Sequence, residues 1–440
     1  MDMGIIVSKF GSSAMANAER IKKTAEIIKS DPRRQYVVVS APGRINPEEI
    51  QIKDLLYILY SKYEARENFQ DTLTDIQARF EEIVNELGVN FNISGEIAEL
   101  NKTLLFGKTR DIIVSRGEYI IAKILAAYLG WTFMDAAKLF FFNNDGSLNE
   151  AQTFTAISQN LSRTPNVVVP GGYGALEGNR ILMTNARGDA AGAVIARVLG
   201  ASLYEKWTDH RGIYIADPTL VEDAQKVRNM TYAELVELSY MGITAVHEEA
   251  ILKLQDSGVP LNVLNIYHPE DKGTLVSMEL PEGIERKVAA CISGRKTYKI
   301  VRIHKMGLNK MHGVGEKVFN IFSRRGISCE HYISGIYNFA VVLKNPMFDL
   351  KREEIIKDIT TAINPEKITV DRDLALIAIV GTGMGTVKGI FARIFDAVAD
   401  AGVKVQLINQ GADSLNIIIG VRDEDFEKTI KALYNAMILD

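Results

Sequence analysis

The sequence is poor in cysteine and has no excess of basic residues. Two cysteines in 440 residues cannot build a disulfide framework or a four-thiolate zinc site, which favours a reducing compartment. Lysine and arginine (51) are outnumbered by aspartate and glutamate (55), which argues against a protein that binds nucleic acid through a basic domain. Neither a His/Cys cluster with metal-ligand spacing nor a Ser-His-Asp hydrolase motif is found, so no protein-held metal is predicted.

The chain also lacks a long hydrophobic run. The longest helical apolar stretch, 119–131, is interrupted by Lys123 and is too short to cross a bilayer. The N-terminus passes into an apolar segment without a basic region or a cleavage site, so we expect no secretory leader. With 47% hydrophobic and 24% charged residues, the composition is that of a globular protein of two to four domains. We expect a cytoplasmic protein that binds neither membrane nor nucleic acid.

In the first 285 residues, short apolar runs alternate with amphipathic segments. Strands are expected at 4–7, 36–40, 167–169 and 201–207, and helices at 19–30, 72–87, 117–129 and 188–199. This alternation predicts an α/β fold in which a mostly parallel sheet is sandwiched by helices. Such sheets bind ligands at the carboxyl ends of their strands, where the glycines of this sequence cluster.

After about residue 290 a pattern occurs twice. The segments 318–322, 326–329 and 333–335 return roughly 75 residues later as 391–395, 402–405 and 408–411. Each copy has the order strand, glycine-containing loop, helix, strand, strand, which predicts a ferredoxin-like βαββαβ module. Two such modules appended to a larger domain suggest regulation. The alternative is one irregular α+β domain with a chance similarity.

The segment 7–13 (VSKFGSS) places a lysine at the end of a strand and before a turn of small residues. Glycine and serine let backbone N–H groups approach phosphate oxygens, and the following helix adds positive potential. Lys9 would supply a cation to a transferring phosphoryl group. The G-x-x-x-x-G-K spacing is absent, so this is no Walker A motif. The alternative is a strand-loop-helix with a chance lysine.

Two further loops carry polar groups at predicted strand ends. The segment 169–174 (VPGGYG) precedes 184–189 (TNARGD), in which Arg187 and Asp189 suit a polyanion with an associated metal or amine. The alternative is turn chemistry with Asp189 as a helix N-cap. In the segment 207–218 (WTDHRGIYIADP), the ring of Tyr214 could stack on a nucleotide base. The alternative is that this segment is only a hairpin.

Taken in this order, the motifs resemble those of the aspartokinase family, within the amino acid kinase superfamily. The resemblance covers essentially the whole chain and rests on five motifs: 9–13 (KFGSS), 115–118 (SRGE), 208–218 (TDHRGIYIADP), 232–247 (YAELVELSYMGITAVH) and 410–417 (QGADSLNI). The last resembles the second of two ACT modules. The resemblance implies an amino acid kinase domain at 1–285, a first ACT domain at 299–365, and a second at 286–298 plus 372–440.

The implied activity is ATP-dependent phosphorylation of the L-aspartate side-chain carboxylate to 4-phospho-L-aspartate, the first step of the lysine, threonine and methionine pathway. Mg²⁺ would be carried by ATP. An end-product amino acid would act as feedback inhibitor, with lysine favoured over threonine because Glu330 can face an ε-ammonium. Homodimers, or dimers of dimers, would form through the ACT domains.

The family's functional residues carry over to matching positions here. The implied catalytic residues are Lys9 and Asp189. The implied ATP-binding residues are Lys9, Phe10, Gly11, Ser12, Thr208, Asp209 and Tyr214. The implied substrate-binding residues are Ser40, Glu118 (for the amino group), Arg187, Gly188 and Asp189. The implied effector residues are Met311, Gly313, Gly315, Ser328, Glu330 and Ser334.

The sequence departs from the family pattern at several of these positions. The arginine expected for the substrate α-carboxylate is displaced, so Arg187 or Asn185 would substitute. Thr219 and Thr244 stand where the family has arginine and a nucleotide-contacting lysine, and Lys53 stands where it has threonine. Two alternatives follow, a catalytically weak ACT-containing amino-acid sensor and another small carboxylate kinase of the superfamily. Because the second module runs to the last residue, no fused homoserine dehydrogenase is expected.

Overall fold

The computed structural model describes residues 4–184, 188–209, 212–284, 289–344, 346–385, 387–411 and 415–438. The chain forms two compact units. The first comprises residues 1–213, 226–239 and 244–284, and the second comprises 214–225, 240–243 and 285–440. The domain limits expected from the sequence therefore remain a proposal. Within the described ranges, no helix is long and apolar enough to cross a membrane.

The first unit is built on an eight-stranded sheet with the order β3-β4-β2-β1-β7-β9-β10-β8. Its strands are β1 (Ile6–Phe10), β2 (Arg34–Val39), β3 (Thr132–Phe133), β4 (Val167–Pro170), β7 (Leu203–Thr208), β8 (Asn229–Thr231), β9 (Leu261–Asn265) and β10 (Thr274–Ser277). All neighbours pair in parallel except β9 and β10. The predicted parallel α/β sheet is confirmed.

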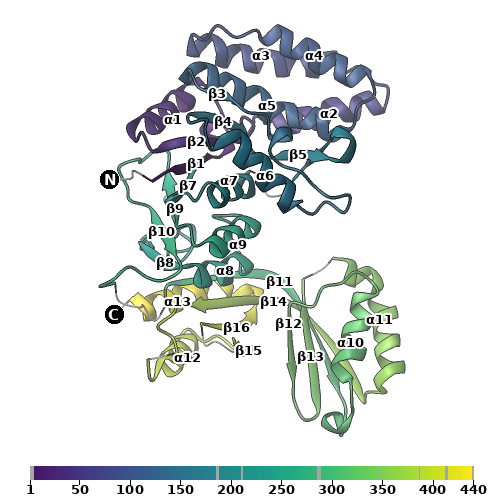
Figure 1. The fold of residues 1–440 in the computed structure, drawn as a ribbon. Helices are drawn as coiled ribbons and strands as arrows, with labels where there is room; N and C mark the ends of the chain where they lie inside the picture. Colours follow the sequence, from purple (N-terminus) through teal and green to yellow (C-terminus); the bar gives the residue numbers. More distant parts are fainter. Residues whose placement is uncertain are drawn as a thin grey trace. The chain divides into compact units, whose positions relative to one another are not determined.

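Helices surround this sheet (Figure 1). They are α1 (Ala18–Ser30), α2 (Ile52–Glu64), α3 (Gln70–Leu87), α4 (Ile93–Leu105), α5 (Arg110–Leu129), α6 (Glu150–Leu161), α7 (Asp189–Val198), α8 (Tyr232–Tyr240) and α9 (Glu248–Ser257). Helix α5 packs on β2 and β4, and α7 packs on β1, β2 and β7. A separate hairpin, β5 (Tyr173–Leu176) with β6 (Arg180–Met183), follows β4.

Local sequence explains where the helices around the site begin and end. Helix α1 starts after Asn17, whose side chain accepts a hydrogen bond from the backbone N–H of Arg20 at 3.0 Å. Helix α5 ends at Gly130, which has a φ of 71°, a left-handed conformation that glycine adopts without strain. The apolar faces of these helices bury a common core with β1, β2 and β4.

The second unit contains one six-stranded antiparallel sheet, β12-β13-β11-β14-β16-β15. Its elements are β11 (Cys291–His304), α10 (Val314–Ser323), β12 (His331–Ser334), β13 (Asn338–Leu343), α11 (Met347–Ile363), β14 (Lys367–Val380), α12 (Ile390–Asp400), β15 (Leu407–Gln410), β16 (Asn416–Arg422) and α13 (Phe426–Ile438). Helices α10 and α11 belong to one half and α12 and α13 to the other (Figure 1).

The two halves of this sheet are the two predicted βαββαβ modules. Strands β11 and β14 are long enough to serve both: 291–295 pairs with 376–380, and 300–304 pairs with 367–371. The register shifts between these two pairings, near Tyr298. Strand β11 begins at Cys291, and residues 285–288, which overlap the segment 286–298 expected in the second ACT domain, lie outside the described part of the chain.

Candidate active site

Two lysines lie side by side on one face of the sheet, at its topological switch point. Strand β1 lies between β2 and β7, so the crevice beyond its carboxyl end is the expected ligand site of an open α/β sheet. Lys9 on β1 is in register with Lys206 on β7, so both side chains leave the same face of the sheet. Both are buried, with 4% and 9% of their surface exposed. Buried ammonium groups require a counter-charge.

Asp189 supplies that counter-charge. It is the first residue of α7, and its Oδ1 lies 2.9 Å from Nζ of Lys9, while its Oδ2 pairs with Lys206. The backbone N–H of His247 also donates to Oδ2 at 3.2 Å. Burial disfavours ionisation, but the charges of Lys9 and Lys206 outweigh it and lower the pKa of Asp189 to about 2.

The geometry decides between two interpretations of Asp189. Gly188 occupies the N-cap position of α7 and no side chain there caps the helix. The carboxylate of Asp189 instead bridges the two lysines, so the alternative of a helix cap is wrong. Gly188 has a φ of 78°, and a Cβ on it would lie 3.2 Å from Cα of Gly171, so both the conformation and the space favour glycine.

The side chains on the opposite face of β1 and β7 make buried hydrogen bonds and pack in the core. The carboxylate of Glu205 accepts hydrogen bonds from Ser8 Oγ at 2.9 Å, Arg34 Nε at 2.8 Å and Trp207 Nε1 at 2.9 Å. Phe10 stacks on Trp207 with ring centroids 5.9 Å apart, and neither ring is exposed. The ring of Phe10, a predicted ATP-binding residue, is therefore part of the core.

A second buried carboxylate, Glu118, lies on α5. The backbone N–H groups of Gly172 and Ala41 donate to it. Burial raises the pKa of Glu118, and the charges of Lys53 and then Lys9 oppose this rise. A Cβ on Gly172 would lie 2.4 Å from Oε2 of Glu118, so only glycine fits there. The Gly-Gly pair found in the sequence thus makes room for this carboxylate.

The turn after β1 and the end of β2 also belong to this crevice. The Ser40 N–H donates to the carbonyl of Phe10 at 3.2 Å, and Ser40 is buried. The Gly11 N–H donates to the carbonyl of Trp207 at 3.3 Å, and a Cβ on Gly11 would lie 3.8 Å from Nζ of Lys9. Ser12 is exposed at the start of a 3₁₀ turn. Lys9 therefore lies beside the small-residue turn, as its motif predicts.

The remaining predicted nucleotide residues are Thr208 and Asp209 of the first unit and Tyr214 of the second. Thr208 ends β7, and its Oγ1 donates to Oδ1 of Asp209 at 3.1 Å. The side chain of Asn265, at the end of β9, donates to the carbonyl of Asp209 at 3.0 Å, so the turn is fixed to the next strand. Tyr214 belongs to the second unit, where its carbonyl accepts from Cys291 Sγ at 3.1 Å. Arg187 and Asn185 lie outside the described residues.

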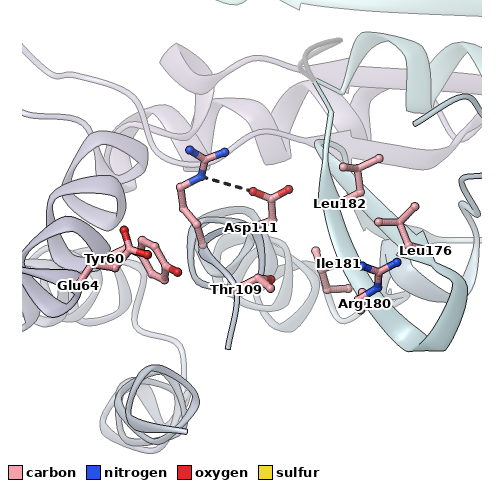
Figure 2. Close-up of a pocket in the computed structure, with 9 residues that line it drawn as sticks. Tyr60, Glu64, Thr109, Asp111, Leu176, Arg180, Ile181 and Leu182 are labelled. Carbon is pink, nitrogen blue, oxygen red and sulfur yellow. Dashed lines mark ion pairs between the residues drawn. The ribbon is translucent and has the colours of Figure 1, made fainter. Parts of the chain in front are cut away.

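A cavity of about 420 Å³ lies between α2, the start of α5 and the β5–β6 hairpin (Figure 2). It contains none of the predicted catalytic residues. Its charged groups interact with one another: Arg110 pairs with Asp111 at 3.6 Å, and Asp111 accepts from the Met183 N–H at 3.0 Å. This contact anchors the hairpin to α5, which carries Glu118.

The predicted effector residues surround the start of α10 and β12 in the second unit. Gly313 is the N-cap of α10, Gly315 lies in its first turn, Met311 packs against the core of the first module, and Ser328 and Ser334 are exposed. The Glu330 carboxylate, expected to face an effector, accepts a hydrogen bond from Tyr240 Oη. The Tyr240 ring also lies edge-on to His331, with centroids 5.9 Å apart.

The interpretation of the sequence missed two residues of these sites. Lys206 was not singled out, although its position between Glu205 and Trp207 in an apolar strand was the available signal. Tyr240 had no signal, because its contact with Glu330 spans 90 positions. In the described part of the chain, no group of three or more His, Cys, Asp and Glu side chains is placed to hold a metal ion.

Comparison with known proteins places this geometry in a family. Residues 4–265 match the amino acid kinase family, and residues 377–437 match an ACT domain. Aspartokinase 3 of Bacillus subtilis is 31% identical, over 97% of both chains. The crystal structure of Clostridium acetobutylicum aspartate kinase, described as an allosteric enzyme, has 36% identity and a TM-score of 0.88, over 99% of this chain and 100% of that one.

A more distant structure shares the fold. Escherichia coli aspartokinase III, in complex with aspartate and ADP, has 22% identity and a TM-score of 0.79, over 99% of this chain and 100% of that one. Two matched domain families and a relative aligned over nearly its full length agree with the motifs of the sequence. The chain is a kinase and belongs to the aspartokinases of the amino acid kinase family, with C-terminal ACT modules.

Proposed function

We propose that this protein transfers the terminal phosphoryl group of ATP to the side-chain carboxylate of L-aspartate, giving 4-phospho-L-aspartate. The observation that carries the proposal is the buried Lys9–Asp189–Lys206 cluster at the carboxyl edge of the sheet, with Glu118 nearby. The names of the relatives support it, since they are aspartokinases and one was crystallised with aspartate and ADP.

The cluster fits the physical demand of this reaction. A carboxylate is already ionised at neutral pH, so the acceptor needs no general base. The barrier is the repulsion between the attacking carboxylate and the phosphate oxygens, which positioned cations and N–H groups reduce. Lys9 would bridge the terminal phosphates and Lys206 would stabilise the same developing charge. Asp189 orients both ammonium groups, and the backbone at Gly11 and Ser12 completes the phosphate cradle.

The remaining roles are those that the family resemblance implies. Thr208, Asp209 and Tyr214 would contact the nucleotide, and Mg²⁺ carried by ATP would neutralise part of the phosphate charge. Ser40, Gly188 and Glu118 would hold aspartate, with the buried Glu118 carboxylate binding the ammonium group. Cys291 and Cys329 form no disulfide, which is consistent with a cytoplasmic location.

We further propose that the product enters the lysine, threonine and methionine pathway and that lysine, with threonine as second candidate, inhibits through the first ACT module. The ε-ammonium of lysine would pair with Glu330 and displace the hydroxyl of Tyr240. A structure of the same fold was solved with lysine and aspartate bound. ACT modules of two or four chains would assemble the homodimer or dimer of dimers.

One assay tests the activity. Purified protein is incubated with ATP, Mg²⁺ and hydroxylamine, which traps acyl phosphates as hydroxamates, with L-aspartate, L-glutamate or N-acetyl-L-glutamate as acceptor. Hydroxamate formed with aspartate alone is the expected result. A preference for another acceptor would make the protein a different carboxylate kinase. Binding of amino acids without turnover would make it a sensor.

A further inference from the structure

Three charged side chains of alternating sign lie on the aspartate side of the site. The positive charges of Lys53 and Lys9 both act on the buried carboxylate of Glu118, that of Lys53 more strongly. Lys9 comes from β1, Glu118 from α5 and Lys53 from the first turn of α2. One buried anion therefore interacts with two cations that come from different elements.

Packing fixes the first turn of α2 beside Glu118. Gly117, the residue before Glu118, has no room for a side chain: a Cβ there would lie 3.2 Å from Cγ2 of Ile52, 3.2 Å from Cβ of Ala41 and 3.0 Å from Cδ1 of Leu56. Ile52 is fully buried and immediately precedes Lys53. Because side chains of α2 pack this closely on the backbone of Gly117, the turn that carries Lys53 is held next to the residue whose carboxylate it influences.

Lys53 is also available to a ligand. It is half-buried, and none of the ion pairs found among the described residues includes it. Its neighbour Asp54 is directed elsewhere, toward Gln51 at 3.0 Å and Arg44 at 3.6 Å. Lys62, at the other end of the same helix, differs in donating to Thr72 Oγ1 at 2.9 Å.

L-Aspartate carries the complementary sequence of charges. Its ammonium group lies between two carboxylates, and the side-chain carboxylate must reach the phosphoryl group beside Lys9 for the proposed reaction. With the ammonium on Glu118 and the side chain toward Lys9, the α-carboxylate is directed to the remaining cation. We infer that Lys53 binds the α-carboxylate of aspartate and so selects acceptors that carry this group.

This inference rests on the proposed function and deepens it. It assigns the α-carboxylate to Lys53 of α2, whereas the sequence alone suggests Arg187 or Asn185, which lie outside the described residues. A charged pair between ammonium and carboxylate in a partly desolvated site changes affinity by roughly 10- to 100-fold. Lys53 would act on substrate binding and leave the phosphoryl transfer step to Lys9 and Lys206.

The test compares two substrates and four proteins. Steady-state kinetics are measured with L-aspartate and with its α-amide. The α-amide keeps the reacting side-chain carboxylate and the ammonium group, but a neutral amide replaces its α-carboxylate. The proteins are wild type, Lys53→Met, Lys53→Arg and the control Lys62→Met, each checked by circular dichroism and thermal unfolding. Lys53→Thr serves as a second neutral variant should Lys53→Met fail to fold.

We expect Lys53→Met to raise KM for aspartate about 10- to 100-fold with kcat changed less than about 3-fold, and Lys53→Arg to recover most of the loss. Wild type should prefer aspartate over the α-amide by a similar factor, and Lys53→Met should lose this preference. Lys62→Met should behave as wild type. An unchanged preference in a folded Lys53 variant overturns the inference, whereas a wild type that does not phosphorylate aspartate overturns the proposed function itself.

Discussion

Replacing Asp189 by asparagine tests whether the central carboxylate holds the two lysines together. Asparagine keeps the shape of aspartate and removes only its charge. At 2.9 Å the Lys9–Asp189 pair is worth about 6 kcal/mol of Coulomb energy at an effective dielectric constant of about 20, before desolvation is subtracted. Removing one partner of a buried pair typically costs about 3–5 kcal/mol. We expect Asp189→Asn to be destabilised by this amount at pH 7.

The pKa of Asp189 predicts how this cost varies with pH. The folded-state pKa of Asp189 is lowered to about 2 from its usual value of 3.8. A lowered pKa stabilises the folded protein above the unfolded-state value, and this stabilisation is lost as the pH falls through the folded-state value. The difference corresponds to about 2 kcal/mol. The gap in stability between wild type and Asp189→Asn should therefore narrow by about 2 kcal/mol between pH 5 and pH 2.

Urea unfolding followed by tryptophan fluorescence measures the free energy of unfolding of the first unit, which contains Asp189. The two tryptophans, Trp131 and Trp207, both belong to the first unit, and Trp207 is next to Lys206 on β7. The double variant Asp189→Asn/Lys206→Met serves as control, because removing one unpaired cation should restore part of the stability. The reasoning is refuted if Asp189→Asn is as stable as wild type at pH 7, or if the double variant is less stable than the single one.

Four further changes have separate readouts. Lys9→Met should lower kcat about 100-fold or more in a folded protein, because it removes one donor to the developing charge, and a near-normal kcat would remove Lys9 from the mechanism. Gly172→Ala should raise KM for aspartate about 10-fold and cost about 1–3 kcal/mol of stability, since its Cβ displaces Glu118; wild-type values of both would contradict this packing. Glu330→Gln should weaken lysine inhibition about 10-fold while activity without lysine is kept, as measured by inhibitor titration, and unchanged inhibition would place the effector elsewhere. Tyr240→Phe should strengthen lysine inhibition, because the competing hydroxyl of Tyr240 is gone, and weaker inhibition would show that this hydroxyl assists the effector.

The sequence was sufficient to predict the parallel sheet because its signals are local. Buried strands such as Val167–Pro170 are short apolar runs between turn residues, and glycines mark their carboxyl ends. The boundaries of helices were predicted less accurately. Helix α5 begins at Arg110, seven positions before the predicted start, and the missed part includes the buried residues Ile113 and Val114.

The arrangement of the site depended on pairings that sequence patterns do not encode. That Lys9 faces Lys206 follows from the register of two strands nearly 200 residues apart. The contact between Glu330 and Tyr240 likewise joins distant segments. Residues in motifs, such as Asp189, were found from sequence, whereas their partners became apparent only in the fold.

The balance of charges at this site explains why two carboxylates are retained in a protein that must bind anionic ligands. Ammonium groups that lie close together, such as those of Lys9 and Lys206, repel one another, and buried charges require counter-charges. Asp189 pairs with both of these lysines, and the Glu118 carboxylate interacts with the charges of Lys53 and Lys9. In the proposed reaction the fold thus positions the cations before nucleotide and aspartate bind, so little reorganisation is needed when charge develops on the phosphoryl group.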